Sequence, residues 1–382
     1  MTTSTTAEPK QQRRLPRVVP LLAVGTFLMI TTEYMVAGLL QEIAGDLNVS
    51  VAHVALLITA FAVGMILGSP VMALATLRLP RRATLVLALL VFAAGHVLAA
   101  LTSDFGIVLL ARVITALAAG AFWSIASVIA TQAAGPANSS RALGVMMSGV
   151  GPAPVIARFT PEDTHTSAPS VRAEIRAVVT GRMVVLVLAT VFATGGYMTA
   201  FSYLSPVATD RGAVPLWAVP LLFVVFGLGA VLGTNLAGRF ADKRPVRTFI
   251  SATGATVLLL GMLIPLSANA VALFVLMFLL GIAGMGIPPV ATGLAATFAQ
   301  GAPTLAAAVA VAAFNGGTAI GTWAGATALE SALGGLGPLV VATIMASLGL
   351  LTLLVFARSK AMTPLNHRTR LDLSSLLRGR NG

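Results

Sequence analysis

Two ionisable side chains lie within long apolar stretches of this sequence. Glu33 is the only acidic residue well inside such a stretch, and Arg112 lies inside another. A charge in apolar surroundings is costly, so it tends to have a partner or face water, and it commonly marks an ion or proton path. The alternative is a static ion pair that locks two helices together. We predict proton or cation exchange at Glu33, whereas for Arg112 a coupling role and a structural role stay equally open.

A second group of residues has the chemistry of a small-molecule cavity. Aromatic side chains can surround a lipophilic ligand, and an amide can hydrogen-bond to it. The candidates are Phe122, Trp123, Tyr197, Phe201 and Asn315. Core packing or contact with lipid explains most of these aromatic residues equally well. Asn315 lies among glycines that favour close helix packing, so it can serve packing, binding or both.

Several kinds of chemistry are excluded or unsupported. The chain has no cysteine, and its four histidines are scattered without the spacing of metal ligands. It lacks the phosphate-binding loop of ATP-driven motors and the common hydrolase motifs. We therefore expect no enzyme activity, no metal and no prosthetic group.

The elements that must position these residues are long apolar segments. Of the 382 residues, 57% are hydrophobic and only 9% are charged, against about 25% charged in a soluble domain. About 20 apolar residues in a helix cross the hydrocarbon core of a bilayer. Ten segments meet this requirement: 18–40, 54–76, 83–101, 106–131, 183–208, 214–237, 248–267, 270–297, 304–329 and 337–357. The sequence predicts an all-α membrane protein with about ten transmembrane helices.

The basic residues are distributed unevenly around these segments. With alternating topology, 22 of the 24 lysines and arginines fall on one side of the membrane; only Arg211 falls on the other, and Arg112 lies within a span. Such asymmetry marks the cytoplasmic side. It predicts that both termini and residues 158–182 are cytoplasmic. It also accounts for the net charge of +12 without nucleic acid as a partner.

The sequence contains an internal repeat at an offset of 165 residues. The segment FAVGMILG at 61–68 matches FGLGAVLG at 226–233 in its Phe, Gly and Leu positions. Pro80 and Arg82, in the following basic turn, are matched by Pro245 and Arg247. Both turns have the same orientation, which indicates two parallel repeats.

The two repeats are unequal in length. Six predicted spans follow residue 182 and four precede it, so the first half is expected to lack one helix pair. The expected division is a cytoplasmic tail at 1–17, a shortened helical half at 18–142, a broken segment and cytoplasmic linker at 143–182, a six-helix half at 183–357 and a basic cytoplasmic tail at 358–382.

At several motifs the chain resembles the drug:proton antiporter branch of the major facilitator superfamily, especially bacterial exporters of the chloramphenicol-resistance and arabinose-efflux types. The motifs are TEYMVAGLL at 32–40, Arg112 with GAFW at 120–123, residues 195–206 and the loop 233–243. The chain departs from the family pattern at Gln41, where proline is usual. It also departs by lacking the fifth and sixth helices.

This resemblance implies a helical bundle of two parallel repeats in the plasma membrane, here with four plus six helices. It implies proton-coupled efflux of a small lipophilic compound by alternating access. Glu33 and Arg112 would then serve proton coupling, and the gating loop would comprise Gly238, Arg239, Asp242 and Lys243. For Asp242 an ordinary helix cap is the alternative.

Two other functions stay open. One is export of sugars, nucleosides or other metabolites. The other, suggested by the missing helix pair, is a degenerate membrane protein that does not transport. The sparse polarity of the spans favours an apolar ligand, so we expect protons, a lipophilic small molecule and the lipid bilayer as partners.

Overall fold

The computed structural model describes residue 16 and residues 18–38, 40–49, 51–76, 79–135, 138–147, 171–299 and 301–358. All regular elements within these ranges are helices, and no strand occurs among them. The predicted all-α fold class is confirmed. Most of the predicted tails and the linker residues 148–170 lie outside the described residues.

The described residues before position 148 form six helices. The apolar segments become helices because lipid offers backbone groups no other hydrogen-bonding partner. Their ends carry cap residues, such as Asp104, whose carboxylate accepts a hydrogen bond from the N–H of Ile107 at 2.9 Å. The helices are α1 (Val18–Gly38), α2 (Leu40–Asp46), α3 (Val51–Ala75), α4 (Arg81–Ala100), α5 (Phe105–Ala134) and α6 (Ser139–Met147).

The described residues from position 171 onward form a second series of helices. The first, α7 (Val171–Val178), is short and carries Glu174 and Arg176. The longer helices again correspond to apolar segments. They are α8 (Gly181–Ser202), α9 (Leu204–Asp210), α10 (Val219–Ala241), α11 (Pro245–Leu266), α12 (Ala270–Met285), α13 (Ile287–Phe298), α14 (Pro303–Leu329) and α15 (Gly337–Arg358).

The predicted spans match the observed helices closely. Within the described ranges, nine helical segments are long and apolar enough to cross a membrane. The remaining predicted span, 18–40, corresponds to α1, whose apolar part is Val18–Glu33. The first residues of the predicted broken segment, 143–147, are helical, because α6 extends to Met147.

One predicted span, 270–297, is interrupted. α12 ends at Met285 and α13 begins at Ile287, directly before Pro288 and Pro289. Proline has no N–H to donate to the preceding turn, but it is well tolerated in the first turn of a new helix. The two proline residues therefore divide this span into two helices.

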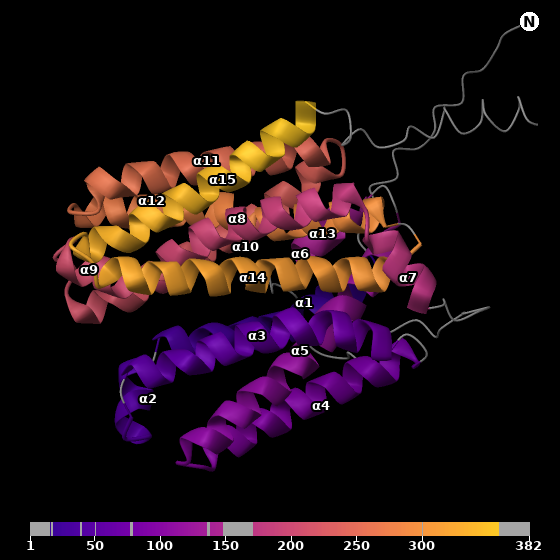
Figure 1. The fold of residues 1–382 in the computed structure, drawn as a ribbon, viewed down its shortest axis with the longest axis horizontal. Helices are drawn as coiled ribbons and strands as arrows, with labels where there is room; N and C mark the ends of the chain where they lie inside the picture. Colours follow the sequence, from indigo (N-terminus) through magenta and orange to yellow (C-terminus); the bar gives the residue numbers. More distant parts are fainter. Residues whose placement is uncertain are drawn as a thin grey trace, which may run out of the picture.

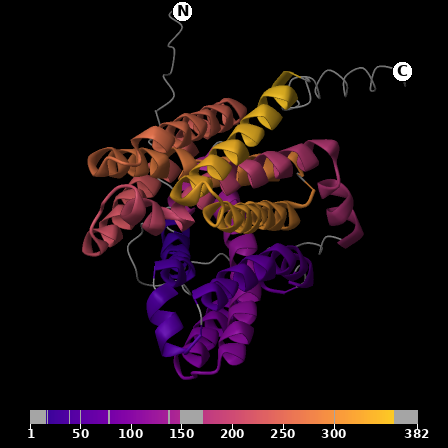
Figure 2. The ribbon, with the colours of Figure 1, turned by 60° about the vertical axis from the view of Figure 1, so that its left-hand side comes forward.

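The helices form two groups that lie side by side (Figure 1). The N-terminal group is α1–α5, and the C-terminal group is α8–α15; each has its own cluster of buried apolar side chains. Figure 2 shows the same separation from a second direction. α14 packs against α3 and α5, and α6 packs against both α1 and α10. These two helices therefore join the groups.

Close packing within the C-terminal group depends on glycine. α10 and α12 approach each other so closely that a Cβ atom at Gly233 would overlap the carbonyl oxygen of Ile282. Small residues at helix contacts are the usual means of packing helices in lipid, where no hydrophobic force draws them together. The glycine shared by the two repeat segments is thus a packing residue here.

Candidate functional site

A cavity of about 80 Å³ lies between the two helix groups. Such a volume holds several water molecules. The N-terminal group contributes Ile30, Glu33, Met65 and Trp123, and α6 contributes Met147. The C-terminal group contributes Thr194, Tyr197, Met198, Thr234, Met285, Pro288, Val311, Phe314, Asn315 and Thr318. The lining is mainly apolar, with one carboxylate.

Glu33 is the ionisable residue of this cavity lining. It lies on α1, and the charge of Arg112 on α5 is near enough to act on it. No direct ion pair between the two is found in the described part of the chain. The acid and the base thus share one region of the N-terminal group.

Arg112 is held by the interior of the N-terminal group. Its side chain is only 5% exposed, and its guanidinium carbon lies 4.7 Å from the centroid of the Phe61 ring on α3. A cation over an aromatic face is attracted by the ring quadrupole. Its Nε has no hydrogen-bond partner among the described residues. Arg112 is therefore a buried cation that is only partly compensated.

The predicted cavity residues divide into two sets. Trp123, Tyr197 and Asn315 line the cavity, and the amide of Asn315 also donates to the carbonyl of Val311 at 3.0 Å. Phe122 and Phe201 do not line it. Phe122 is 1% exposed in the core of the N-terminal group, and the Phe201 ring packs against two rings of α10 at centroid distances of 5.2 and 4.7 Å.

Sequence reasoning missed the methionines of the cavity. Met65, Met147, Met198 and Met285 come from four different helices and meet at one space. Methionine is unbranched and polarizable, so it adapts to ligands of different shape. Single methionines in apolar spans carry no distinguishing signal, and only the fold brings these four together.

The predicted gating loop lies at the start of α6. A Cβ atom at Gly238 would lie 2.6 Å from the carbonyl oxygen of Ser140, so only glycine permits this approach. The carboxylate of Asp242 accepts a hydrogen bond from the N–H of Arg141 at 3.2 Å. Arg239 and Lys243 are exposed. Asp242 thus caps a helix 101 residues away in sequence.

The surroundings of Asp242 affect its protonation. Burial raises the pKa of Asp242, and the N–H groups of Arg141 and Ser140, together with the Arg141 charge, offset part of that rise. N–H groups at a helix N-terminus favour a carboxylate. The loop therefore ties α10 to α6 through a carboxyl group that is partly withdrawn from water.

Comparison with known proteins agrees with this architecture. Residues 22–161 match the family model described as Major Facilitator Superfamily. The chain is 32% identical to a chloramphenicol resistance protein of Streptomyces lividans, over 90% of this chain and 96% of that protein. It is 28% identical to the inner membrane transport protein YdhP of Escherichia coli K12, with the same coverage.

Solved structures share the fold at low sequence identity. The crystal structure of the human organic anion transporter MFSD10 superposes with a TM-score of 0.68 at 17% identity, covering 91% of this chain and 99% of that one. Two groups of membrane-spanning helices, a cavity between them and the similarity to the Streptomyces protein lead to one assignment. The chain is a multi-pass membrane protein and belongs to the major facilitator superfamily of transporters.

Proposed function

We propose that this transporter exports a small lipophilic compound, of the kind represented by chloramphenicol, in exchange for protons. The observation that carries the proposal is the position of Glu33. It lines a mainly apolar cavity shared by both helix groups, close to the buried Arg112. An acid in this position can bind a proton when the cavity faces one side of the membrane and release it when the cavity faces the other.

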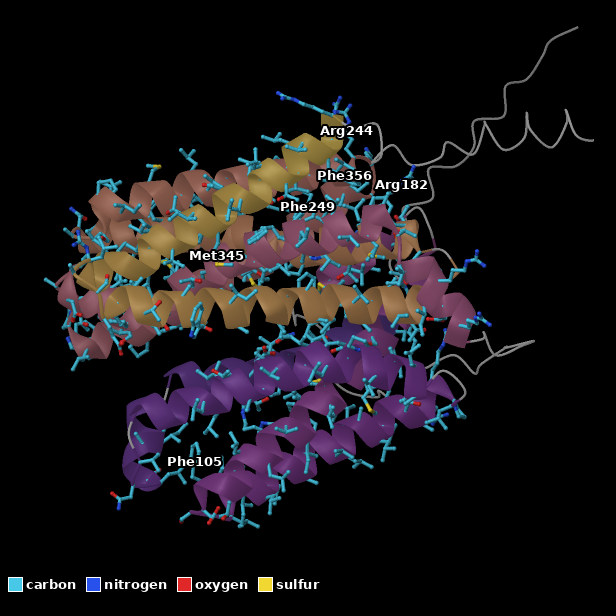
Figure 3. All side chains as sticks on the ribbon, viewed as in Figure 1. Phe105, Arg182, Arg244, Phe249, Met345 and Phe356 are labelled. Atoms are coloured by element: carbon cyan, nitrogen blue, oxygen red, sulfur yellow. The ribbon has the colours of Figure 1, made fainter. Side chains whose placement is uncertain are left out.

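We propose the plasma membrane as the location, with the α7 end of the bundle in the cytoplasm. Basic residues gather at that end: Arg182 and Arg244 lie towards it, whereas Phe105 lies towards the opposite end (Figure 3). Cytoplasmic loops are those enriched in lysine and arginine. In this proposed orientation both termini are inside the cell.

In the described conformation the two helix groups are joined at the α7 end. At the α7 end, α6 is packed against α10 at Gly238 and capped by Asp242. α14 also seals against the N-terminal group, because its Val311 belongs to that group's buried cluster. Opening of the cytoplasmic end requires the release of these contacts. Transport then alternates between this state and one in which the contacts form at the other end.

The division into repeats is part of the proposal. The first half has four spans and the short helix α6, whereas the second has six spans. Because two helices are missing, the following helices keep their orientation in the membrane and the two repeats stay parallel. We propose the limits 18–142 and 183–357 for the two halves; α8 begins two residues before the second limit, at Gly181, and α15 ends one residue after it, at Arg358. α6 (Ser139–Met147) crosses the limit at residue 142, and it supplies Met147 to the cavity.

The lining favours a lipophilic ligand over the two alternatives. Sugars and nucleosides need several hydrogen bonds, and the polar lining consists of a few threonines, Tyr197, Asn315 and Glu33. A degenerate protein that does not transport has no use for a buried acid, whose burial costs stability. One experiment separates drug export from both alternatives.

The test is a drug-susceptibility panel in a bacterial host that lacks its own drug pumps. The parent chain is expected to raise tolerance to chloramphenicol or related lipophilic drugs, and Glu33→Gln to abolish that gain at equal membrane abundance. The amide keeps the shape of the side chain and removes its titration. Protection by Glu33→Gln equal to that of the parent would exclude Glu33 as the coupling acid. Absence of protection by the parent would exclude drug export.

A further inference from the structure

Glu174 is a buried acid that the transport cycle proposed above does not use. It lies on α7, in the connection between the two helix groups, and its side chain is fully buried. One carboxylate oxygen accepts a hydrogen bond from the N–H of Leu305 at 3.2 Å. The other has no hydrogen-bond partner among the described residues. Burying a carboxyl group with one oxygen unpaired costs free energy, so its contact with Leu305 needs an explanation.

The contact caps α14. This helix begins at Pro303, and its own N-cap residue, Ala302, makes no side-chain hydrogen bond. The first N–H groups of a helix have no partner within the helix, and an acceptor supplied by a side chain stabilises them. Here the acceptor comes from a residue 131 positions earlier in the chain. Glu174 therefore joins α7 to the first turn of α14.

The start of α6 shows the same arrangement with a different acid. There the capping carboxylate is Asp242, from the turn after α10. The repeat offset of 165 residues relates Ser140 on α6 to Leu305 on α14. The same offset relates Asp242 to Leu77, which has no acceptor in its side chain. Asp242 of the second repeat thus caps α6 of the first. The equivalent position of the first repeat, Leu77, offers no acid to cap α14.

We propose that Glu174 takes the place of that missing acid, and is a positioning residue that docks α7 on α14. α14 carries Phe314, Asn315 and Thr318 of the cavity and packs against α3 and α5 of the other group. Docking of α7 therefore holds the first turn of α14, the helix that joins the two groups. The role in transport rests on the function proposed above, whereas the docking itself does not.

The structure provides a direct measure of docking. A Cβ atom at Gly301 would lie 3.9 Å from the Cβ atom of Ala177 on α7, which is within the range of a disulfide. The chain has no cysteine of its own. The double variant Ala177→Cys, Gly301→Cys is therefore expected to cross-link on mild oxidation in native membranes, and the rate reports how often α7 is docked.

Three further substitutions in this double variant test the role of Glu174. Glu174→Ala removes the acceptor and is expected to slow cross-linking roughly 2- to 30-fold, the range that loss of a helix cap produces. Glu174→Gln keeps an acceptor oxygen and cannot ionise, so it is expected to cross-link at least as fast as the parent. Arg176→Ala, on the exposed face of the same helix, is the matched control and should change nothing. Cross-linking of Glu174→Ala at the parent rate would overturn the proposal, because apolar contacts would then suffice.

A transport measurement separates this inference from the proposed function. With chloramphenicol as the probe, Glu174→Ala without the cysteines is expected to lower the maximal export rate and leave the half-saturating concentration unchanged, since Glu174 does not line the cavity. Glu174→Gln should restore the maximal rate. An altered half-saturating concentration with an unaltered maximal rate would contradict the positioning role. If the parent exports nothing, the proposed function fails, and the docking is still decided by the cross-linking rates.

Discussion

The guanidinium of Arg112 lies 4.7 Å from the centre of the Phe61 ring, between α5 and α3 of the N-terminal group. Because Nε of Arg112 has no hydrogen-bond partner among the described residues, the ring is a principal contact of this buried cation. The Glu33 carboxyl is an electrostatic neighbour and not a direct partner. Arg112 is thus held independently of the acid that it influences.

This arrangement predicts the effect of removing the ring. Phe61→Leu keeps the position apolar but loses the attraction between cation and ring, about 0.5–2 kcal/mol. The variant is expected to unfold at a lower temperature in detergent than the parent. Adding Arg112→Met to Phe61→Leu should lower the unfolding temperature little further, because the two residues act as a pair. Equal and additive losses from the two substitutions would show that the ring does not stabilise Arg112.

The neighbouring residues Phe122 and Trp123 should respond differently to truncation. Trp123 lines the cavity, so Trp123→Ala is expected to raise the half-saturating concentration of a lipophilic substrate about 10- to 100-fold. Phe122 is buried in the core, so Phe122→Ala should cost about 3–5 kcal/mol of stability. Transport assays and thermal unfolding of both variants check this. Reversed outcomes would mean that the cavity lies on the other side of α5.

A glycine of the repeat segment is predicted to be intolerant of any side chain. Gly233→Ala places a methyl group against the Ile282 carbonyl, which is expected to cost about 1–3 kcal/mol by overpacking. Gly261 on α11 is the matched control, because a Cβ atom there meets nothing within 4 Å. Gly261→Ala should leave the unfolding temperature unchanged or raise it. Similar behaviour of the two variants would contradict the close approach of α10 and α12.

Docking of α7 should depend on pH. Burial raises the pKa of Glu174, partly offset by the N–H of Leu305, so the docked state binds a proton more tightly than the released state. Docking is therefore strongest below the ordinary glutamate pKa of 4.5 and weakens as pH rises through the raised value. Among the described residues, the charged groups on α7 and the start of α8 are Arg172 and Arg176, which are exposed, and Arg182; the first turn of α14 is uncharged.

The measurement is the cross-linking rate of Ala177→Cys, Gly301→Cys as a function of pH. This rate is divided by that of the same variant carrying Glu174→Gln. The division cancels the effect of thiol ionisation, because both variants carry the same two cysteines. The ratio is expected to fall as pH rises. A flat ratio would show that Glu174 does not titrate with docking.

The proposed orientation gives a labelling prediction. Ile175 on α7 and Asp210 at the end of α9 are both exposed, and they lie on opposite sides of the membrane in our topology. In intact cells, cysteine at position 210 should react with an impermeant thiol reagent, and cysteine at position 175 should react only after the membrane is opened. The opposite pattern would invert the topology.

The long helices were predictable because each lies in an apolar segment of the right length, whereas the break between α12 and α13 and the short helices α2 and α7 were not. The residues that line the cavity were only partly predictable. Neighbouring positions on a helix point about 100° apart, so Phe122 and Trp123 look equivalent in sequence, yet one faces the core and the other the cavity. The docking of Glu174 on Leu305 was not predictable, because no pattern joins residues so far apart.

The division of one span at Pro288 has a mechanical consequence. α12 packs against α10 through glycine contacts, and α13 packs against α6, α8, α10, α11 and α14. Pro289 offers no N–H to the carbonyl of Met285, four residues earlier, so the backbone at this point bends without breaking a hydrogen bond. Met285 and Pro288, which form part of the cavity wall, therefore lie at the junction of two helices. A change in the angle between α12 and α13 would therefore cost no helix hydrogen bond at Pro289, and it would move Met285 and Pro288 in the cavity wall.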